Sequence, residues 1–357
     1  MAPPPAPRTE HQQCLATVNA TLTLLSRFTS ALGTSETNYV ADISVLDLLA
    51  KSATLIKAHT TKLSLLMINK PFTPSAIRKI VDTMSSEALT GMASGVQLCD
   101  PPHYTQLLND EVTQRVRRVY RELQALMQEM LVLLEAMEKE DKTVVGRDTL
   151  ASTGVLWEAC DAVIELGKLE LAGLVVVKAQ QYRNLLEDAI SELKEWVEGD
   201  EEDDEEEEEE EEEDADSFDG DDDESDDIGK LLSGGGSLPK SRPDLKETAE
   251  LAQKTLRLIS TLYLAVNKRR LKGLPALAIP ENARLDSAMN ELKIIPEEVD
   301  ELVSACYDLD NEQARARIKA VVDHGKGVVV QLRKGWKDQD DEFTAWSTRW
   351  EEAVDKE

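Results

Sequence analysis

The chain has 357 residues, enough for two domains of ordinary size, and its formal net charge at neutral pH is −30. Residues 198–227 contain 24 acidic residues and no Lys or Arg, so the rest of the chain carries a net charge of only −6. That balance argues against a protein that binds duplex nucleic acid through clustered Lys and Arg.

The remaining composition favours a soluble intracellular protein. No window approaches the roughly 18 apolar residues that a membrane span needs. The segment Met1–Glu10 is proline-rich without an apolar core, so it does not resemble a secretory signal peptide. The four cysteines are far apart and none forms a CxxC pair, which suits a reducing compartment.

The first half of the chain predicts a helical bundle. Residues 1–9 are expected to be disordered. Apolar residues then recur at steps of three and four, which predicts helices over 10–32, 40–69, 75–98 and 104–139. Residues 153–199 predict two more helices, broken near Gly167. Gly91 and Gly95, four residues apart, are expected to let a neighbouring helix approach closely. The bundle is therefore assigned to residues 10–199.

A linker and a second bundle follow. Residues 200–214 are fifteen consecutive acids, and the stretch to residue 243 adds Gly, Ser and Pro, so 200–243 is predicted to be a disordered acidic linker. Residues 244–357 predict helices over 245–271, 282–292, 297–309, 311–336 and 340–354. Pro296 and Asp310 are interpreted as signals at the start of two of these helices.

The acidic segment has two interpretations. A solvated linker is favoured, because hard cations need spaced ligands in a defined turn. The alternative is a binding segment for basic partners such as histones, and the representative acids for it are Glu205, Glu209, Glu213, Asp221 and Asp222. Ser217 and Ser225 lie among carboxylates and are candidate sites for an acid-directed kinase.

Other candidate chemistry is weak, and we expect no catalytic, metal or cofactor site and no small-molecule substrate. His11, His59, His103 and His324 have no partner at metal-ligand spacing. The basic run 268–272 is interpreted as a helix end in preference to a contact for RNA or an import receptor. Trp346 and Trp350, four residues apart, are expected to pack on their own domain, or to anchor a partner if they are exposed.

The order of parts resembles the cyclin-D-binding protein family, also called GCIP-like proteins. The resemblance rests on the hexapeptide VLWEAC at 155–160, on the following helix through Ala179, Glu187, Ala189 and Val197, and on 80–82 with Gly91-Met92. It implies an all-α fold of two antiparallel bundles, as in vinculin and the catenins. It also implies a non-enzymatic role in cytoplasm and nucleus, binding cyclin-type or helix-loop-helix regulators. The more uniformly acidic linker departs from animal members and indicates a fungal-type or otherwise divergent member.

The sequence therefore predicts an adaptor or regulator that recognises partner helices in a groove between its own helices. The competing hypothesis is a chaperone for basic proteins in which the acidic segment carries the function. The two differ in whether binding survives deletion of that segment.

Overall fold

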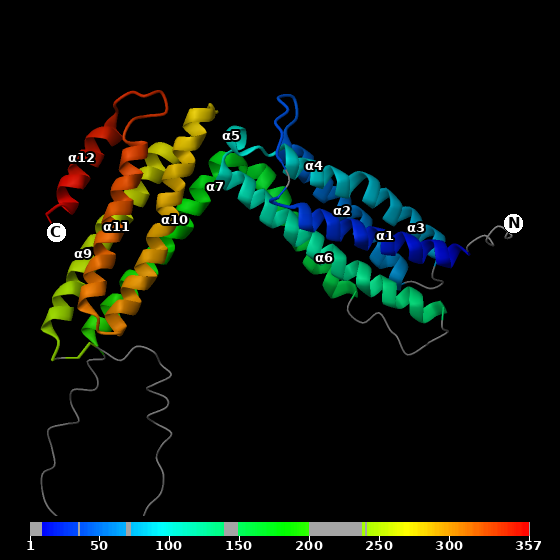
Figure 1. The fold of residues 1–357 in the computed structure, drawn as a ribbon, viewed down its shortest axis with the longest axis horizontal. Helices are drawn as coiled ribbons and strands as arrows, with labels where there is room; N and C mark the ends of the chain where they lie inside the picture. The colour runs from blue at the N-terminus through cyan, green and yellow to red at the C-terminus, as the bar shows by residue number, and fades with distance from the viewer. Residues whose placement is uncertain are drawn as a thin grey trace, which may run out of the picture. The chain divides into compact units, whose positions relative to one another are not determined.

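A computed structural model describes residues 9–34, 36–68, 73–138, 149–199, 238–239 and 241–356. These residues form helices joined by short connections, and the described part contains no strand, so the predicted all-α class is confirmed. The chain divides into two compact units (Figure 1). Unit one is Met1–Leu174 with Ala278–Ala283, and unit two is Val175–Leu277 with Arg284–Glu357. The predicted linker residues 200–237 and the N-terminal residues 1–8 lie outside the described ranges.

Unit one is built from helices whose apolar stripes share one core. In chain order they are α1 (Glu10–Ala31), α2 (Val45–Ile68), α3 (Pro74–Thr83), the π-helix η1 (Met84–Leu89), α4 (Thr90–Leu98), α5 (Pro101–Tyr104), α6 (Gln106–Glu138) and the first part of α7 (Thr149–Glu198). Thr9 caps α1 together with Gln12 in a capping box, and Pro74 and Pro101 begin two of the helices. Helix α1 lies against α3 and α6 (Figure 1).

Small residues determine how closely α2 and α4 pack. A Cβ added to Gly95 would come within 2.6 Å of Leu49 Cδ2, and one added to Gly91 would come within 2.6 Å of Ser52 Oγ. Both helix axes can approach this closely only because neither position carries a side chain. The close approach expected from Gly91 and Gly95 is therefore confirmed, and it holds the segment that begins with α4 against the rest of unit one.

Unit two contains the second part of α7, α9 (Pro243–Val266), the π-helix η3 (Asn267–Leu271), α10 (Ile279–Tyr307, after its first residues), α11 (Asn311–Leu332) and α12 (Glu342–Val354). Helix α9 packs against α11 and α12. Gly325 of α11 allows this packing, because a Cβ there would lie 2.9 Å from both Ile259 and Trp350. Asp310 accepts a hydrogen bond from the Gln313 amide and caps α11 as the sequence predicted.

The structure divides the chain at a different place from the sequence-based boundary at residue 199. The division falls inside α7, between Leu174 and Val175. The helix has one non-helical residue, Glu170, with φ 53° and ψ −171°, close to the break expected near Gly167. Beyond it, the buried residues of α7 pack into unit two: Trp196 stacks edge-on against Tyr307 with ring centroids 5.6 Å apart. The apolar stripe of 175–198 therefore belongs to the second core.

The predicted break at Pro296 is wrong, because α10 continues through this proline. A proline inside a helix leaves the carbonyl four residues earlier without its amide partner. That carbonyl belongs to Leu292, and the buried Tyr263 hydroxyl of α9 donates to it at 2.5 Å. A side chain from another helix thus replaces the missing backbone hydrogen bond.

Candidate functional site

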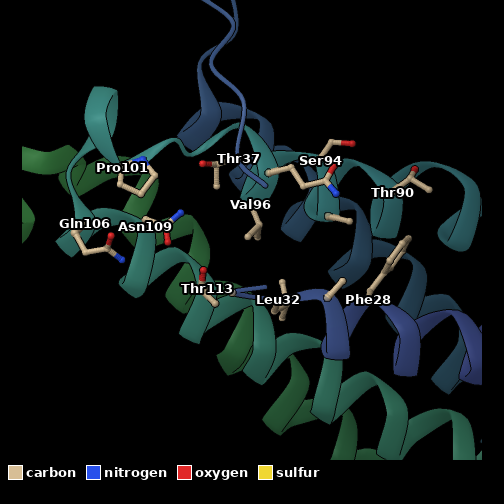
Figure 2. A pocket seen from close by; sticks show the side chains of 14 residues that line it. Phe28, Leu32, Thr37, Thr90, Ser94, Val96, Pro101, Gln106, Asn109 and Thr113 are labelled. Atoms are coloured by element: carbon tan, nitrogen blue, oxygen red, sulfur yellow. The ribbon is translucent and has the colours of Figure 1, made fainter. Parts of the chain in front are cut away.

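Unit one contains a pocket of about 410 Å³ where the end of α1, the helix α4 and the start of α6 meet. Phe28 comes from α1 and Leu32 is the residue that follows its end, Thr90 and Ser94 come from α4, and Asn109 and Thr113 come from α6; Figure 2 shows these side chains around the pocket. The remaining lining residues are Ala31, Gly33, Thr37, Ala93, Val96, Gln97, Pro101 and Gln106. The volume falls in the range of small-ligand sites.

None of the lining residues is charged, although nearly a third of the chain is Asp, Glu, Lys or Arg. Two charged groups outside the lining form hydrogen bonds with lining residues. Asp100 accepts a 2.9 Å hydrogen bond from the Thr37 hydroxyl, and Arg117 donates to the Leu32 carbonyl at 3.4 Å. Both groups hold lining residues in place, and the pocket surface itself consists of neutral polar and apolar atoms.

Thr113 is the most unusual lining residue. It is 7% exposed, and its hydroxyl oxygen has no hydrogen-bond partner among the described residues. Figure 2 shows the Thr113 side chain on α6 directed into the pocket. One turn earlier, Asn109 donates from Nδ2 to the Cys99 carbonyl at 2.6 Å, which fixes the plane of its amide. An unpaired buried hydroxyl is costly, and its place in the pocket lining makes Thr113 a candidate contact for a bound group.

The segment 36–43 forms one edge of the pocket. The Asn38 amide donates to the Gln97 carbonyl at 2.8 Å, and Tyr39 stacks on His103 with ring centroids 3.8 Å apart and planes 3° apart. His103 in turn contacts Asp100 at 2.7 Å. Hydrogen bonds from His103 and Thr37 lower the pKa of the Asp100 carboxyl below its ordinary value. These contacts tie the segment to α4 and α5 and keep the pocket edge ordered.

A second candidate surface lies on α2 and the first part of α7. The two helices are joined by the hydroxyls of Ser64 and Thr153, 2.5 Å apart, and by a 2.6 Å ion pair between Lys57 and Asp161. Several large apolar side chains on these two helices are exposed: Leu55, Leu65, Ile68, Leu150 and Val155. Exposed apolar side chains on two adjoining helices are typical of a surface that binds another helix.

The sequence-predicted interaction residues have different outcomes. Glu205, Glu209, Glu213, Asp221 and Asp222 lie outside the described residues, as do Ser217 and Ser225. Trp350 is 4% exposed and donates from its indole nitrogen to the Leu258 carbonyl at 2.8 Å. Trp346 is half-buried, stacks on Trp350 and lies tilted against Phe343. The pair packs on its own unit, so Trp350 is not available as a partner anchor.

The basic run 268–272 is also tied to its own unit. Arg270 is 3% exposed and forms a bidentate pair with Asp341, at 2.8 and 2.9 Å. Its guanidinium also donates to the carbonyls of Leu332 and Arg333, and lies over the Phe343 ring, 4.4 Å from the centroid. A fully engaged guanidinium cannot also bind RNA or an import receptor, so Arg270 serves to join η3, α11 and α12.

The histidines and cysteines take structural positions. His324 contacts Glu291 at 2.6 Å, and His11 contacts the Leu134 carbonyl at 2.9 Å. Within the described ranges, no group of His, Cys, Asp and Glu is arranged to hold a metal ion. All four thiols are buried, and burial raises their pKa values, to about 11 for Cys14 and Cys306 and about 12 for Cys99 and Cys160. The described helices include none long and apolar enough to cross a membrane.

Sequence reasoning did not find the pocket. Its lining residues come from the four helices α1, α4, α5 and α6 and from the segment between α1 and α2, and each is an ordinary neutral residue in its local context. The only local signal is the neutral polar character of Gln106, Asn109 and Thr113 on one side of a helix that is otherwise rich in charge. That signal becomes specific only when the helices are packed.

The fold is that of an all-α protein of two helical units, and the first unit carries the two candidate surfaces. Comparison with known proteins makes the assignment more definite. Residues 48–199 match the family model described as "Grap2 and cyclin-D-interacting, N-terminal". This match confirms, over those residues, the resemblance to cyclin-D-binding proteins. An uncharacterized protein of Schizosaccharomyces pombe is 26% identical over 320 residues, covering 86% of this chain and 83% of the relative.

Proposed function

We propose that the protein is a non-enzymatic protein-binding regulator that acts in cytoplasm and nucleus on cyclin-type or helix-loop-helix partners. The observation that carries the proposal is the match of residues 48–199 to a family described by its interaction with cyclin D. These residues include almost all of α2, together with α4, α6 and α7. We further propose that this binding regulates the cell cycle or transcription.

The contact surface is proposed to include the exposed apolar side chains of α2 and the first part of α7. Leu65 is 55% exposed and Leu150 is 70% exposed, so both side chains offer apolar area that a partner helix would remove from water. The Ser64–Thr153 contact fixes the two helices at this point and gives the partner a defined surface. An amphipathic helix presented by a cyclin-type protein suits it.

Binding of the full chain to a purified D-type cyclin tests the proposal. Leu65→Glu places a charge in the proposed contact, and we expect it to weaken binding at least about tenfold. The matched control is Val330→Glu, an exposed apolar residue of unit two, which should leave the affinity unchanged. Circular dichroism confirms that both variants remain helical. Equal affinities of the two variants, or no binding by the unmodified chain, would contradict the proposal.

A second function is favoured by composition: 24 acidic residues without a Lys or Arg between 198 and 227 suit binding to basic proteins. Deletion of residues 200–227 separates the two functions. Binding of histones that disappears on deletion and at high salt supports the chaperone function. Cyclin binding that survives both treatments supports the regulator, with the linker as a spacer.

A further inference from the structure

We propose that the pocket between α1, α4 and α6 binds a small uncharged organic molecule that has an apolar body and at least one hydrogen-bonding group. The proposal concerns a site away from the exposed apolar side chains of α2 and α7, and it does not depend on the protein-binding role. It rests on the size of the pocket, the neutrality of its wall and the unpaired hydroxyl of Thr113.

The size and lining suit such a molecule. A volume of about 410 Å³ is within the range of small-ligand sites, and the wall alternates apolar and neutral polar side chains. Phe28, Leu32 and Val96 supply apolar surface, as Figure 2 shows. Phe28 is itself braced by Tyr120, whose ring centroid is 5.9 Å away, so the apolar side of the pocket is backed by the core of unit one.

The wall selects against charge. A charged molecule that leaves water needs a counter-charge or several hydrogen bonds, and none of the lining residues is ionisable. Of the two charged groups that bond to lining residues, Asp100 is engaged with Thr37 and His103, and Arg117 is exposed to solvent and donates to the Leu32 carbonyl. A neutral molecule meets no such penalty.

Among the described residues, Thr29, Thr113 and Thr255 have unpaired buried hydroxyls, and of these three only Thr113 lines the pocket. Several threonines within helices of this chain donate to the carbonyl four residues earlier, as Thr54, Thr60 and Thr83 do at 2.8 to 2.9 Å. The buried hydroxyl of Thr113 makes no such bond and has no other partner in the described part of the chain. Because a helical threonine has two accessible χ1 rotamers, a rotation exchanges its methyl and hydroxyl groups at the wall. A bound molecule with a carbonyl or hydroxyl group would satisfy it.

Asn109 supplies a second polar contact. Its Nδ2 is held by the Cys99 carbonyl, so the amide plane is fixed and Oδ1 remains to accept a hydrogen from the molecule. Asn109 and Thr113 are one helical turn apart on α6 and both line the pocket. A primary amide, which both donates and accepts, matches the pair.

The test uses three probes with the same phenyl group and three-carbon chain: neutral 3-phenylpropanamide, anionic 3-phenylpropanoate and cationic 3-phenylpropylamine. They are titrated into the full chain carrying isotope-labelled threonine methyl groups, observed by NMR. We expect the amide to shift the Thr37, Thr90 and Thr113 signals with a dissociation constant on the order of 1 mM. Thr54 on the surface of α2 is the internal reference and should not shift. Both charged probes should bind at least about tenfold more weakly.

Thr113→Val tests the hydroxyl, with Thr54→Val as the matched control. We expect the Thr113 variant to bind the amide roughly five- to twentyfold more weakly, with Thr37 and Thr90 as reporters. Its thermal midpoint should be unchanged or higher, because an unpaired buried hydroxyl is removed. Ala93→Leu, which fills the pocket from α4, should abolish the shifts. Equal binding of the three probes, no shift with the amide, or undiminished binding by the Thr113 variant would overturn the proposal.

Discussion

Arg270 is a buried charge whose guanidinium is paired and hydrogen-bonded by neighbouring groups. Asp341 and the carbonyls of Leu332 and Arg333 surround the guanidinium, and Asp341 also caps α12 by accepting from the amides of Phe343 and Thr344. The Asp341 carboxylate thus both pairs with Arg270 and caps the start of α12. The hydrogen bonds from Arg270 lower the pKa of Asp341 below its ordinary value.

This lowered pKa predicts a pH dependence of stability. A carboxyl with a lowered folded pKa contributes stability above its unfolded pKa of about 4 and loses it as the pH falls through the folded value. Asp341→Asn keeps a capping side chain but removes the charge. We expect it to lower the free energy of unfolding by about 2 kcal/mol at neutral pH, less than a wholly buried pair because Asp341 is a third exposed.

Urea unfolding at neutral pH and at about pH 3 measures this difference. The gap between the unmodified chain and the asparagine variant should shrink toward the lower pH. A gap of equal size at both values would show that the charge of Asp341 contributes nothing.

Glycine substitutions give a second residue-scale prediction. Gly95→Ala places a Cβ 2.6 Å from Leu49, and we expect a loss of about 1–3 kcal/mol in the stability of unit one. Gly154→Ala in α7 meets no atom within 4 Å, so it should stabilise by about 0.5–1 kcal/mol through helix propensity. Thermal unfolding followed by circular dichroism distinguishes the two, and a stabilising Gly95→Ala would show that the two helices are able to separate.

At the scale of helices, the sequence predicted well where the helices lie but predicted poorly whether a helix continues through a proline. Periodicity located α1, α6, α9 and α11 because each buries one stripe along its length. It failed at Pro296, because the group that replaces the missing amide is Tyr263, which lies on another helix. No local pattern records such a distant donor. The same limit explains why Thr113 and the pocket were missed, since neighbours decide whether a hydroxyl is paired.

The link between Tyr263, Leu292 and Pro296 predicts a double-mutant result. Tyr263→Phe leaves the buried Leu292 carbonyl without a partner, and we expect a loss of about 1–3 kcal/mol. With Pro296→Ala the helix regains an amide that donates to the same carbonyl, so the cost of Tyr263→Phe should fall well below that value. Chemical denaturation of the four chains gives the coupling. Additive effects would mean that the hydroxyl and the proline act independently.

At the scale of the whole molecule, α7 contributes to two cores, and composition alone suggested a boundary at the acidic segment. The change in composition at residue 199 shows where the chain stops being buried. The structure shows a different position, inside α7, where the helix passes from the core of unit one to the core of unit two. In unit two, Leu186, Leu193 and Trp196 are buried, and the Trp196 carbonyl accepts from the Leu238 amide at 3.0 Å. The sequence pattern shows that these residues are buried without showing which core receives them.

Fragments test this assignment. We expect residues 175–357 to unfold cooperatively, whereas 244–357 should be poorly folded because the apolar surface that α7 covers is exposed to water. Thermal scans by circular dichroism compare the two. As a control, a peptide of residues 175–199 added in trans should restore a cooperative transition to the shorter fragment. A shorter fragment that folds well without the peptide would return the boundary to residue 199.

Each unit contains a buried cysteine whose rate of alkylation reports the opening of that unit. Cys14, Cys99 and Cys160 belong to unit one, and Cys306 belongs to unit two. Since alkylation requires an accessible thiolate, each cysteine reacts only when its surroundings open. The order in which the native protein takes up an alkylating reagent, read peptide by peptide by mass spectrometry, therefore records which half of the molecule opens first, with no engineered label.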